Sequence, residues 1–180
     1  MNKVEIPLSK TKLTLTILGA FSFVFFGTLF IINPDKFVSP FLQNPEIVKI
    51  VGIIGVSLFS ALGIYGIKKL FDKKFGLTLD ENGITDNTNA SSVGLIKWNE
   101  IIEIKAEQIM STKFLLIFIN DPNKILEQTS GMKRKILQGN MKMHGTPISI
   151  TSTTLKYKFD DLNKLLTERL NEQREKMPNR

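Results

Sequence analysis

The chain has no cysteine, and it has only one histidine and one tryptophan in 180 residues. Without cysteine no disulfide bond can form, which is compatible with a domain that stays in the cytoplasm. A tight zinc or copper site would have to combine carboxylates with the single imidazole of His144, because thiolate ligands are absent. We therefore expect no metal site and no cofactor, and we expect His144 to lie on the surface or in a loop.

Common sequence motifs of catalysis are also absent. There is no Gly-Lys-Ser/Thr phosphate loop and no Gly-x-Ser-x-Gly nucleophile elbow. The neighbouring carboxylates Asp160 and Asp161 stand where a helix is expected to begin, and the helix dipole favours acidic side chains there. An enzymatic function would need a pocket that recruits Glu100, Glu103 or Asp121. We expect no catalytic residue and a protein that is not an enzyme.

Two long apolar runs, Leu13 to Ile32 and Ile50 to Ile67, dominate the first part of the chain. About 20 apolar residues at 1.5 Å per residue match the roughly 30 Å hydrocarbon layer of a bilayer. The runs predict two membrane spans, at about 13–32 and 48–67, joined by a loop short enough to make them antiparallel neighbours. Neither run contains an acid, histidine, asparagine or glutamine, so no pore or transport path is expected.

A cleaved signal peptide is the alternative interpretation of the first run, since Lys3, Lys10 and Lys12 precede it. Signal peptides have an apolar core of only about 7–15 residues and end at a small-residue cleavage site. This run is longer and ends in Phe30-Ile31-Ile32-Asn33-Pro34. We therefore expect the segment to remain in the protein as a membrane span.

The distribution of lysine predicts the orientation of the spans. The net charge is +7, of which residues 1–75 supply nine lysines against four acids, and residues 76–180 supply fifteen basic against thirteen acidic groups. The cationic surplus thus lies beside the spans, and positively charged flanks stay in the cytoplasm. We expect a multi-pass protein of the cytoplasmic membrane with both termini cytoplasmic. We expect no nucleic-acid partner, because most of the basicity is accounted for by topology.

Six glycines form strips of small residues on the two runs. Small residues allow helix backbones to approach closely, which drives helix association in lipid. We expect these strips to pack the two helices of the hairpin together. Packing between copies of the chain, or with the subunits of a larger membrane complex, is the alternative. The six residues are Gly19, Gly27, Gly52, Gly55, Gly63 and Gly66.

Beyond the first 75 residues, which hold the N-terminal flank and the hairpin, the pattern changes to short alternating strands. Residues 76–180 predict a cytoplasmic domain with strands at 76–79, 84 onward, 93–104, 113–119 and 147–157. A bend or bulge is expected at Asn99-Glu100, within the segment 93–104. A helical insert of one or two short helices, interrupted at Ser130-Gly131, is expected at about 122–138, and an amphipathic terminal helix is expected at about 159–174. The fold class is α+β: a transmembrane hairpin followed by a small β-barrel or sandwich that the terminal helix caps. Trp98 is expected in its core.

The segment Gly94-Leu95-Ile96-Lys97-Trp98-Asn99-Glu100-Ile101 resembles the third-strand signature of bacterial pleckstrin-homology-like domains. Together with Asn140 to Ile150, which contains Gly145-Thr146-Pro147, and the opening Ile6 to Lys10, it resembles a family of small bacterial membrane proteins with two transmembrane helices before such a domain. The resemblance implies two orthogonal antiparallel sheets capped by a C-terminal helix. It implies no catalytic residue, and the fold serves many unrelated functions.

A basic stretch with methionines, 131–143, is the one candidate binding segment. Its cations are Lys133, Arg134, Lys135 and Lys142. Near an anionic leaflet each contributes about 1 kcal/mol, and the interleaved apolar residues favour an interfacial helix. The other interpretation is a solvated helix whose apolar residues pack on the domain. The leading hypothesis is a membrane-anchored, non-enzymatic interaction module that binds a protein or membrane lipids. The alternative is an accessory subunit of a larger membrane complex, or a homo-oligomer, assembled through the spans.

Overall fold

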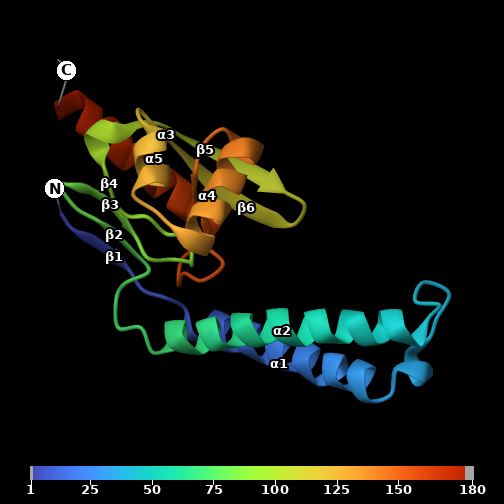
Figure 1. The fold of residues 1–180 in the computed structure, drawn as a ribbon. Coiled ribbons are helices and arrows are strands. Elements are labelled where there is room, and N and C mark those ends of the chain that lie inside the picture. The colour runs from blue at the N-terminus through green and yellow to red at the C-terminus, as the bar shows by residue number, and fades with distance from the viewer. Residues whose placement is uncertain (1, 177–180) are drawn as a thin grey trace. The chain divides into compact units, whose positions relative to one another are not determined.

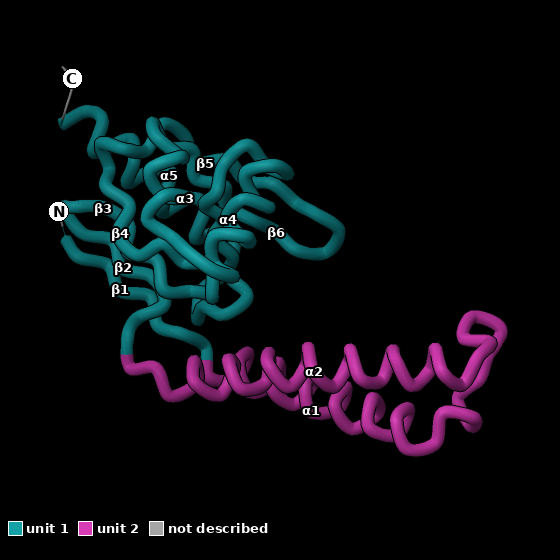
Figure 2. The backbone as a smooth tube through the Cα atoms, in the orientation of Figure 1, with its two compact units in different colours: residues 1–9, 74–180 teal, residues 10–73 magenta. Residues whose placement is uncertain are grey.

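The structure is a computed structural model that describes residues 2–176, and the chain forms two compact units (Figures 1 and 2). Residues 10–73 form the first unit, called the hairpin below. Residues 1–9 and 74–180 form the second, called the domain. The sequence assigned all of residues 1–75 to the flank and the hairpin, whereas the first nine residues belong to the domain. A strand of three residues is too short to produce a periodic pattern.

The hairpin consists of α1 (Lys10–Ile32), a short 3₁₀ helix η1 (Pro34–Phe37) and α2 (Pro45–Leu70). The side chain of Asn44 caps α2 by accepting a hydrogen bond from the Glu46 N–H at 2.8 Å, and Pro45 occupies the first helical turn. Both helices are long and apolar enough to cross a bilayer. Both helices extend beyond the expected spans at 13–32 and 48–67. Hydropathy marks only the apolar part of a helix, whereas the lysines and the glutamate at the helix ends are also in helical conformation.

The two helices pack along one seam, and four of the six glycines contribute to it. A Cβ atom built on Gly52 would lie 2.7 Å from the carbonyl oxygen of Gly27, and one on Gly66 would lie 2.9 Å from Ile17. Gly63 faces Ala20, and Phe23 stacks on Phe59 with ring centroids 4.2 Å apart. Backbones can approach this closely only where side chains are absent.

The other two glycines, Gly19 and Gly55, lie away from this seam. A Cβ atom built on either one would meet no described atom within 4 Å. The helical arc drawn from the sequence included both, because an arc of residues does not say which part of it faces the neighbouring helix. Gly19 and Gly55 therefore do not contribute to the packing of α1 against α2.

The first sheet of the domain has the strand order β1-β2-β3-β4, with all pairs antiparallel. Its strands are β1 (Val4–Ile6), β2 (Leu77–Leu79), β3 (Gly83–Asp86) and β4 (Gly94–Lys97). Strand β1 precedes the hairpin in the chain and pairs with β2, which follows it (Figure 1). Two segments that are distant in sequence thus form one sheet edge, and Ile6 joins the core.

A corner at Trp98 divides the segment 93–104, which the sequence predicted as a strand with a bend or bulge at Asn99-Glu100. The 3₁₀ turn η2 (Trp98–Glu100) separates β4 from β5 (Ile101–Ile109). Trp98 is 3% exposed, and its indole N–H donates to the Asp80 carbonyl at 2.8 Å. The buried indole fixes the corner and confirms the expected core position of Trp98.

The second sheet has the order β5-β6-β7, again antiparallel. Strand β6 spans Thr112–Ile119, and β7 spans only Ile148–Ile150, which is shorter than the predicted 147–157. Neither sheet closes on itself among the described residues, so the domain is a two-sheet sandwich rather than a barrel, and the α+β class is as expected. The bulge in β5 lies between Ile101 and Glu103.

Three helices complete the domain: α3 (Pro122–Glu127), α4 (Gly131–His144) and α5 (Phe159–Lys176). Helices α3 and α4 form the expected helical insert, although α4 continues beyond the predicted end at 138, and they are separated before Gly131, which adopts a φ of 60°. The buried residues Leu162, Leu166 and Leu170 place one face of α5 against the core formed by both sheets. This helix therefore caps the sandwich, as the 159–174 periodicity predicted.

Candidate functional site

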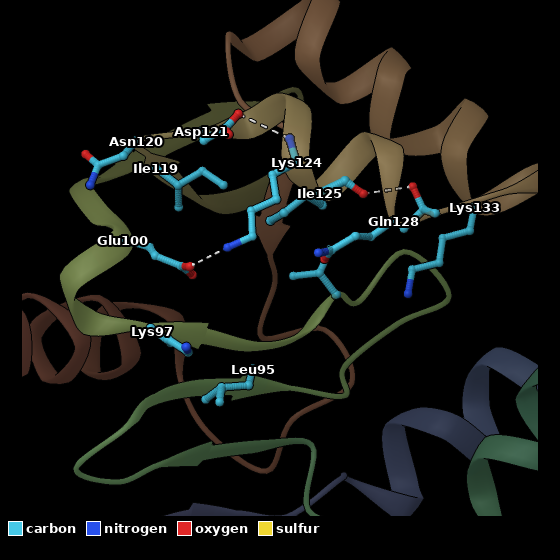
Figure 3. Close-up of a pocket in the computed structure, with 12 residues that line it drawn as sticks. Leu95, Lys97, Glu100, Ile119, Asn120, Asp121, Lys124, Ile125, Gln128 and Lys133 are labelled. Carbon is cyan, nitrogen blue, oxygen red and sulfur yellow. Dashed lines mark hydrogen bonds and ion pairs between the residues drawn. The ribbon is translucent and has the colours of Figure 1, made fainter.

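A groove of about 450 Å³ lies between β4 and the helices α3 and α4 (Figure 3). We call it the β4–α3 groove. Its volume falls in the range typical of ligand sites, and all of its lining belongs to the domain. The lining residues are Val93, Leu95, Lys97, Glu100, Ile119, Asn120, Asp121, Lys124, Ile125, Gln128, Thr129 and Lys133.

Local hydrogen bonds hold the helical wall of the groove in place. Asp121 caps α3 by accepting from the Lys124 N–H at 3.2 Å. The Nζ atom of Lys124 lies 3.1 Å from Oε1 of Glu100 in η2, which ties the helix to the corner beside β4 (Figure 3). Asn120 donates from Nδ2 to the Asn99 carbonyl at 3.2 Å. These contacts give the groove a fixed width at its η2 end.

The groove brings together Glu100 and Asp121, two of the three carboxylates considered for an enzyme, while Glu103 lies outside its lining. Both carboxylates have partners: Glu100 pairs with Lys124, and Asp121 caps α3. The pair at the start of α5 is likewise accounted for, since Asp160 and Asp161 lie in its first turn and Asp160 Oδ1 is 3.0 Å from Lys113 Nζ.

Two cations of the groove, Lys97 and Lys133, differ from Lys124, which forms an ion pair with Glu100. Within residues 2–176 the side-chain ammonium group of neither one makes a hydrogen bond or an ion pair. Lys97 comes from β4 and Lys133 from α4, so they belong to opposite walls (Figure 3). Three lysines against two acids, Glu100 and Asp121, leave the lining with a net charge of +1.

Helix α4 presents a separate apolar surface to solvent. Met132 and Met143 are each 72% exposed and Ile136 is 39% exposed. At 100° per residue these three residues, called the outer stripe below, fall within an arc of about 40°. Lys135 and Lys142 lie along one flank of the stripe, both exposed. Apolar side chains bordered by lysines are the arrangement expected of an interfacial helix.

Contacts of Leu137 and Asn140 fix which face of α4 packs against the rest of the domain. Leu137 is buried, and the side-chain amide of Asn140 donates to the Pro147 carbonyl at 3.1 Å and to Ser149 Oγ at 3.2 Å. The structure therefore separates the four cations predicted as one cluster. Lys133 lines the groove, whereas Arg134, Lys135 and Lys142 are exposed outside it. No sequence pattern indicates which of the four cations faces the groove, because the inner face of α4 has one buried aliphatic residue and one asparagine.

His144 is the last residue of α4, and its side chain is only 7% exposed, which corrects the expectation of a surface or loop position. Its ring stacks on Phe114, and Nδ1 lies 3.7 Å from Glu107 Oε1, too far for a hydrogen bond. This Nδ1 is a buried atom without a hydrogen-bond partner among the described residues. Over the same part of the chain, no group of three His, Asp or Glu side chains converges on a position that would hold a metal ion.

Comparisons with known proteins add no further assignment. The chain matches no model of a known protein family, no curated protein and no solved structure.

Proposed function

We propose that this chain is a membrane-anchored, non-enzymatic interaction module whose domain lies at the cytoplasmic leaflet and binds anionic lipid through α4. The observation that carries the proposal is the outer stripe of α4, an exposed apolar surface bordered by lysines. We include in the proposal a pleckstrin-homology-like ancestry for the domain. Its two antiparallel sheets and its terminal helix support that ancestry.

The exposed surface of the hairpin supports membrane insertion. Most of its large apolar side chains face outward, among them Phe21, Phe25 and Phe26. Exposed apolar surface on this scale is disfavoured in water and is matched by lipid. A core helix of a soluble protein would instead bury such residues. In the apolar stretch of each helix only 11% of the residues are buried.

The pairing of β1 with β2 supports a common side for the two ends of the hairpin. Only residues 7–9 connect β1 to α1, and residues 71–76 connect α2 to β2. If both helices span the bilayer, the two strands can pair only when both ends of the hairpin emerge on one side. The lysines beside those ends favour the cytoplasm as that side.

Reporter fusions test this orientation. Alkaline phosphatase is active only outside the cytoplasm, so we expect it to be inactive when fused before Met1 or after Arg180. Insertion of the same enzyme into the loop between η1 and α2, at Pro40, should give activity at least tenfold higher. An active terminal fusion, or an inactive loop insertion of equal abundance, would contradict the placement.

The lipid contact follows from the chemistry of α4. Methionine and isoleucine side chains of the outer stripe gain free energy on leaving water, and Lys135 and Lys142 extend toward lipid phosphates. Near an anionic surface each lysine contributes about 1 kcal/mol. The hairpin already anchors the domain, so even a weak contact is favoured by the high effective concentration of lipid.

We expect a dye at Met132 or Met143 to report this contact. The chain has no native cysteine, so Met132→Cys and Met143→Cys allow a single environment-sensitive label on the full chain in lipid nanodiscs. Emission should shift to the blue in phosphatidylglycerol compared with phosphatidylcholine. The shift should disappear when Lys135 and Lys142 are both replaced by glutamine.

The matched control is Met110→Cys, because Met110 is an exposed methionine at the tip of the β5–β6 hairpin. Its label should emit alike in both lipids. Equal emission from Met132→Cys in both lipids, or an equal shift at Met110→Cys, would remove the outer stripe from the proposed function.

An accessory subunit of a larger membrane complex is the second candidate. The observation that favours it is the position of Gly19 and Gly55, which the hairpin leaves unused. Small residues on a lipid-facing surface allow another helix to approach closely. Crosslinking in native membranes that recovers only the monomer would count against this candidate.

A further inference from the structure

Strand β4 is one of the two edge strands of the first sheet, since its only neighbour among the described strands is β3. The backbone N–H of Trp98 donates to the backbone carbonyl of Asn82, the residue directly opposite on the neighbouring chain segment. Hydrogen-bonded and non-hydrogen-bonded pairs alternate along antiparallel strands. Ile96 is therefore a hydrogen-bonded partner of β3, whereas the N–H and C=O groups of Leu95 and Lys97 point away from it.

The β4–α3 groove runs along this free edge. Its strand side is lined by the alternate residues Val93, Leu95 and Lys97, and its other side by α3 and the start of α4. Ile119 and Ile125 supply apolar surface inside it. A strand edge whose backbone N–H and C=O groups point outward beside a groove with apolar lining is the geometry in which an extended peptide adds to a sheet.

Charge defines the chemistry of the peptide. Lys97 and Lys133 stand on opposite walls and have no ion-pair partner within residues 2–176, whereas Glu100 and Asp121 are already engaged by contacts with residue Lys124. A peptide with acidic residues at alternate positions would satisfy the two lysines. Its intervening apolar residues would meet Ile119 and Ile125, because side chains alternate between the two faces of a strand.

We propose that the β4–α3 groove binds an extended, acidic segment of a partner protein, which adds to the first sheet as a strand beside β4. The N–H and C=O groups of Leu95 and the N–H group of Lys97 supply the main-chain hydrogen bonds, and the side chains of Lys97 and Lys133 select acidic side chains. This binding does not rest on the lipid contact of α4, because the outer stripe and Lys135 lie outside the groove.

The test uses the full chain in nanodiscs of neutral phosphatidylcholine and a fluorescein-labelled peptide Glu-Val-Glu-Val-Glu. We expect saturable binding by fluorescence anisotropy, and a loss of affinity of at least tenfold for Lys97→Glu and for Lys133→Glu. Lys135→Glu is the matched control, since it makes the same charge change on the same helix outside the groove. Its affinity should stay within twofold of the unmodified chain.

Two methylated peptides test the strand geometry independently of charge. One carries N-methyl groups on both valines and the other on the second and third glutamates, so that each removes the N–H groups of one edge of the peptide strand. We expect only one of the two to lose binding. Three results would each overturn the proposal. They are equal affinity of both methylated peptides, equal weakening by Lys133→Glu and Lys135→Glu, and the absence of saturable binding.

Discussion

Replacing Gly83 with alanine is expected to disrupt the first sheet of the domain. The added Cβ atom would overlap the carbonyl group of Ile96 and lie 2.9 Å from the Cα atom of Lys97, both in β4. These are backbone atoms, so no rotation of a side chain relieves the overlap, and the paired strands must separate. Overpacking a well-packed site costs about 1–3 kcal/mol, and we expect a cost at or above the upper end.

Trp98 is the only tryptophan and is buried next to Asp80, so its fluorescence reports unfolding of the domain directly. We expect the melting temperature of the full chain in detergent to fall by more than about 10 °C for Gly83→Ala. Peptide binding at the β4–α3 groove should be lost as well. A melting temperature within a few degrees of the unmodified protein would contradict the close approach of β3 and β4.

Gly139→Ala is the matched control for this substitution. Gly139 lies inside α4, and a Cβ atom there would meet no described atom within 4 Å. Alanine is favoured over glycine in a helix interior by about 1 kcal/mol. The same chemical change should therefore raise the melting temperature slightly at Gly139 and lower it strongly at Gly83.

Replacing Gly52 with leucine is expected to separate the helices of the hairpin. The Cβ atom alone would lie 2.7 Å from the Gly27 carbonyl oxygen and 2.9 Å from the Phe30 Cβ atom. The rest of the leucine side chain would need space that the seam does not contain. Gly55→Leu is the matched control, because it makes the same change on the same helix at a position with no described atom nearby.

A cysteine pair measures this separation. A Cβ atom on Gly63 would lie 3.8 Å from the Cβ atom of Ala20, which is the mean separation in a disulfide. We expect Ala20→Cys with Gly63→Cys to crosslink nearly completely under mild oxidation. After cleavage at a protease site inserted at Pro40, the two halves should then stay joined until they are reduced.

With Gly52→Leu added, we expect the crosslinked fraction to fall at least fivefold, whereas Gly55→Leu should leave it unchanged. Because the chain has no native cysteine, no other disulfide competes in this assay. Persistent crosslinking in the Gly52→Leu chain, or an equal loss in both variants, would show that the seam is not organised around the approach of Gly27 and Gly52.

The predictions from sequence succeeded where one signal was strong and local. The apolar runs located both long helices, and the leucine spacing of the terminal segment located α5 and its buried face. The sequence also placed Trp98 in the core. It also indicated a bend at Asn99-Glu100 and an interruption at Ser130-Gly131, where η2 and the break between α3 and α4 lie. It did not indicate that the chain passes from one sheet to the other at this bend, because that depends on how the strands pair.

The candidate sites show the same limit more clearly. The sequence grouped Lys133 with Arg134, Lys135 and Lys142, but a one-residue step on a helix turns a side chain by about 100°. The groove itself had no sequence signature, because its lining comes from β4, η2, β6, α3 and α4. Of the lining residues, the sequence analysis considered Glu100 and Asp121 as carboxylates of an enzyme and Lys133 as a membrane contact, and none of the three for binding a peptide.

The sequence by itself determined that this chain has two long apolar helices, an α+β domain, no cysteine and a cationic surplus beside the helices. These features depend on composition and on periodicity within single segments. Only the tertiary structure decided that β1 joins the sheet of the domain, which glycines form the hairpin seam, and which lysines face the groove. The physical reason is that pairing, close approach and cavity formation depend on contacts between segments that are distant in the chain.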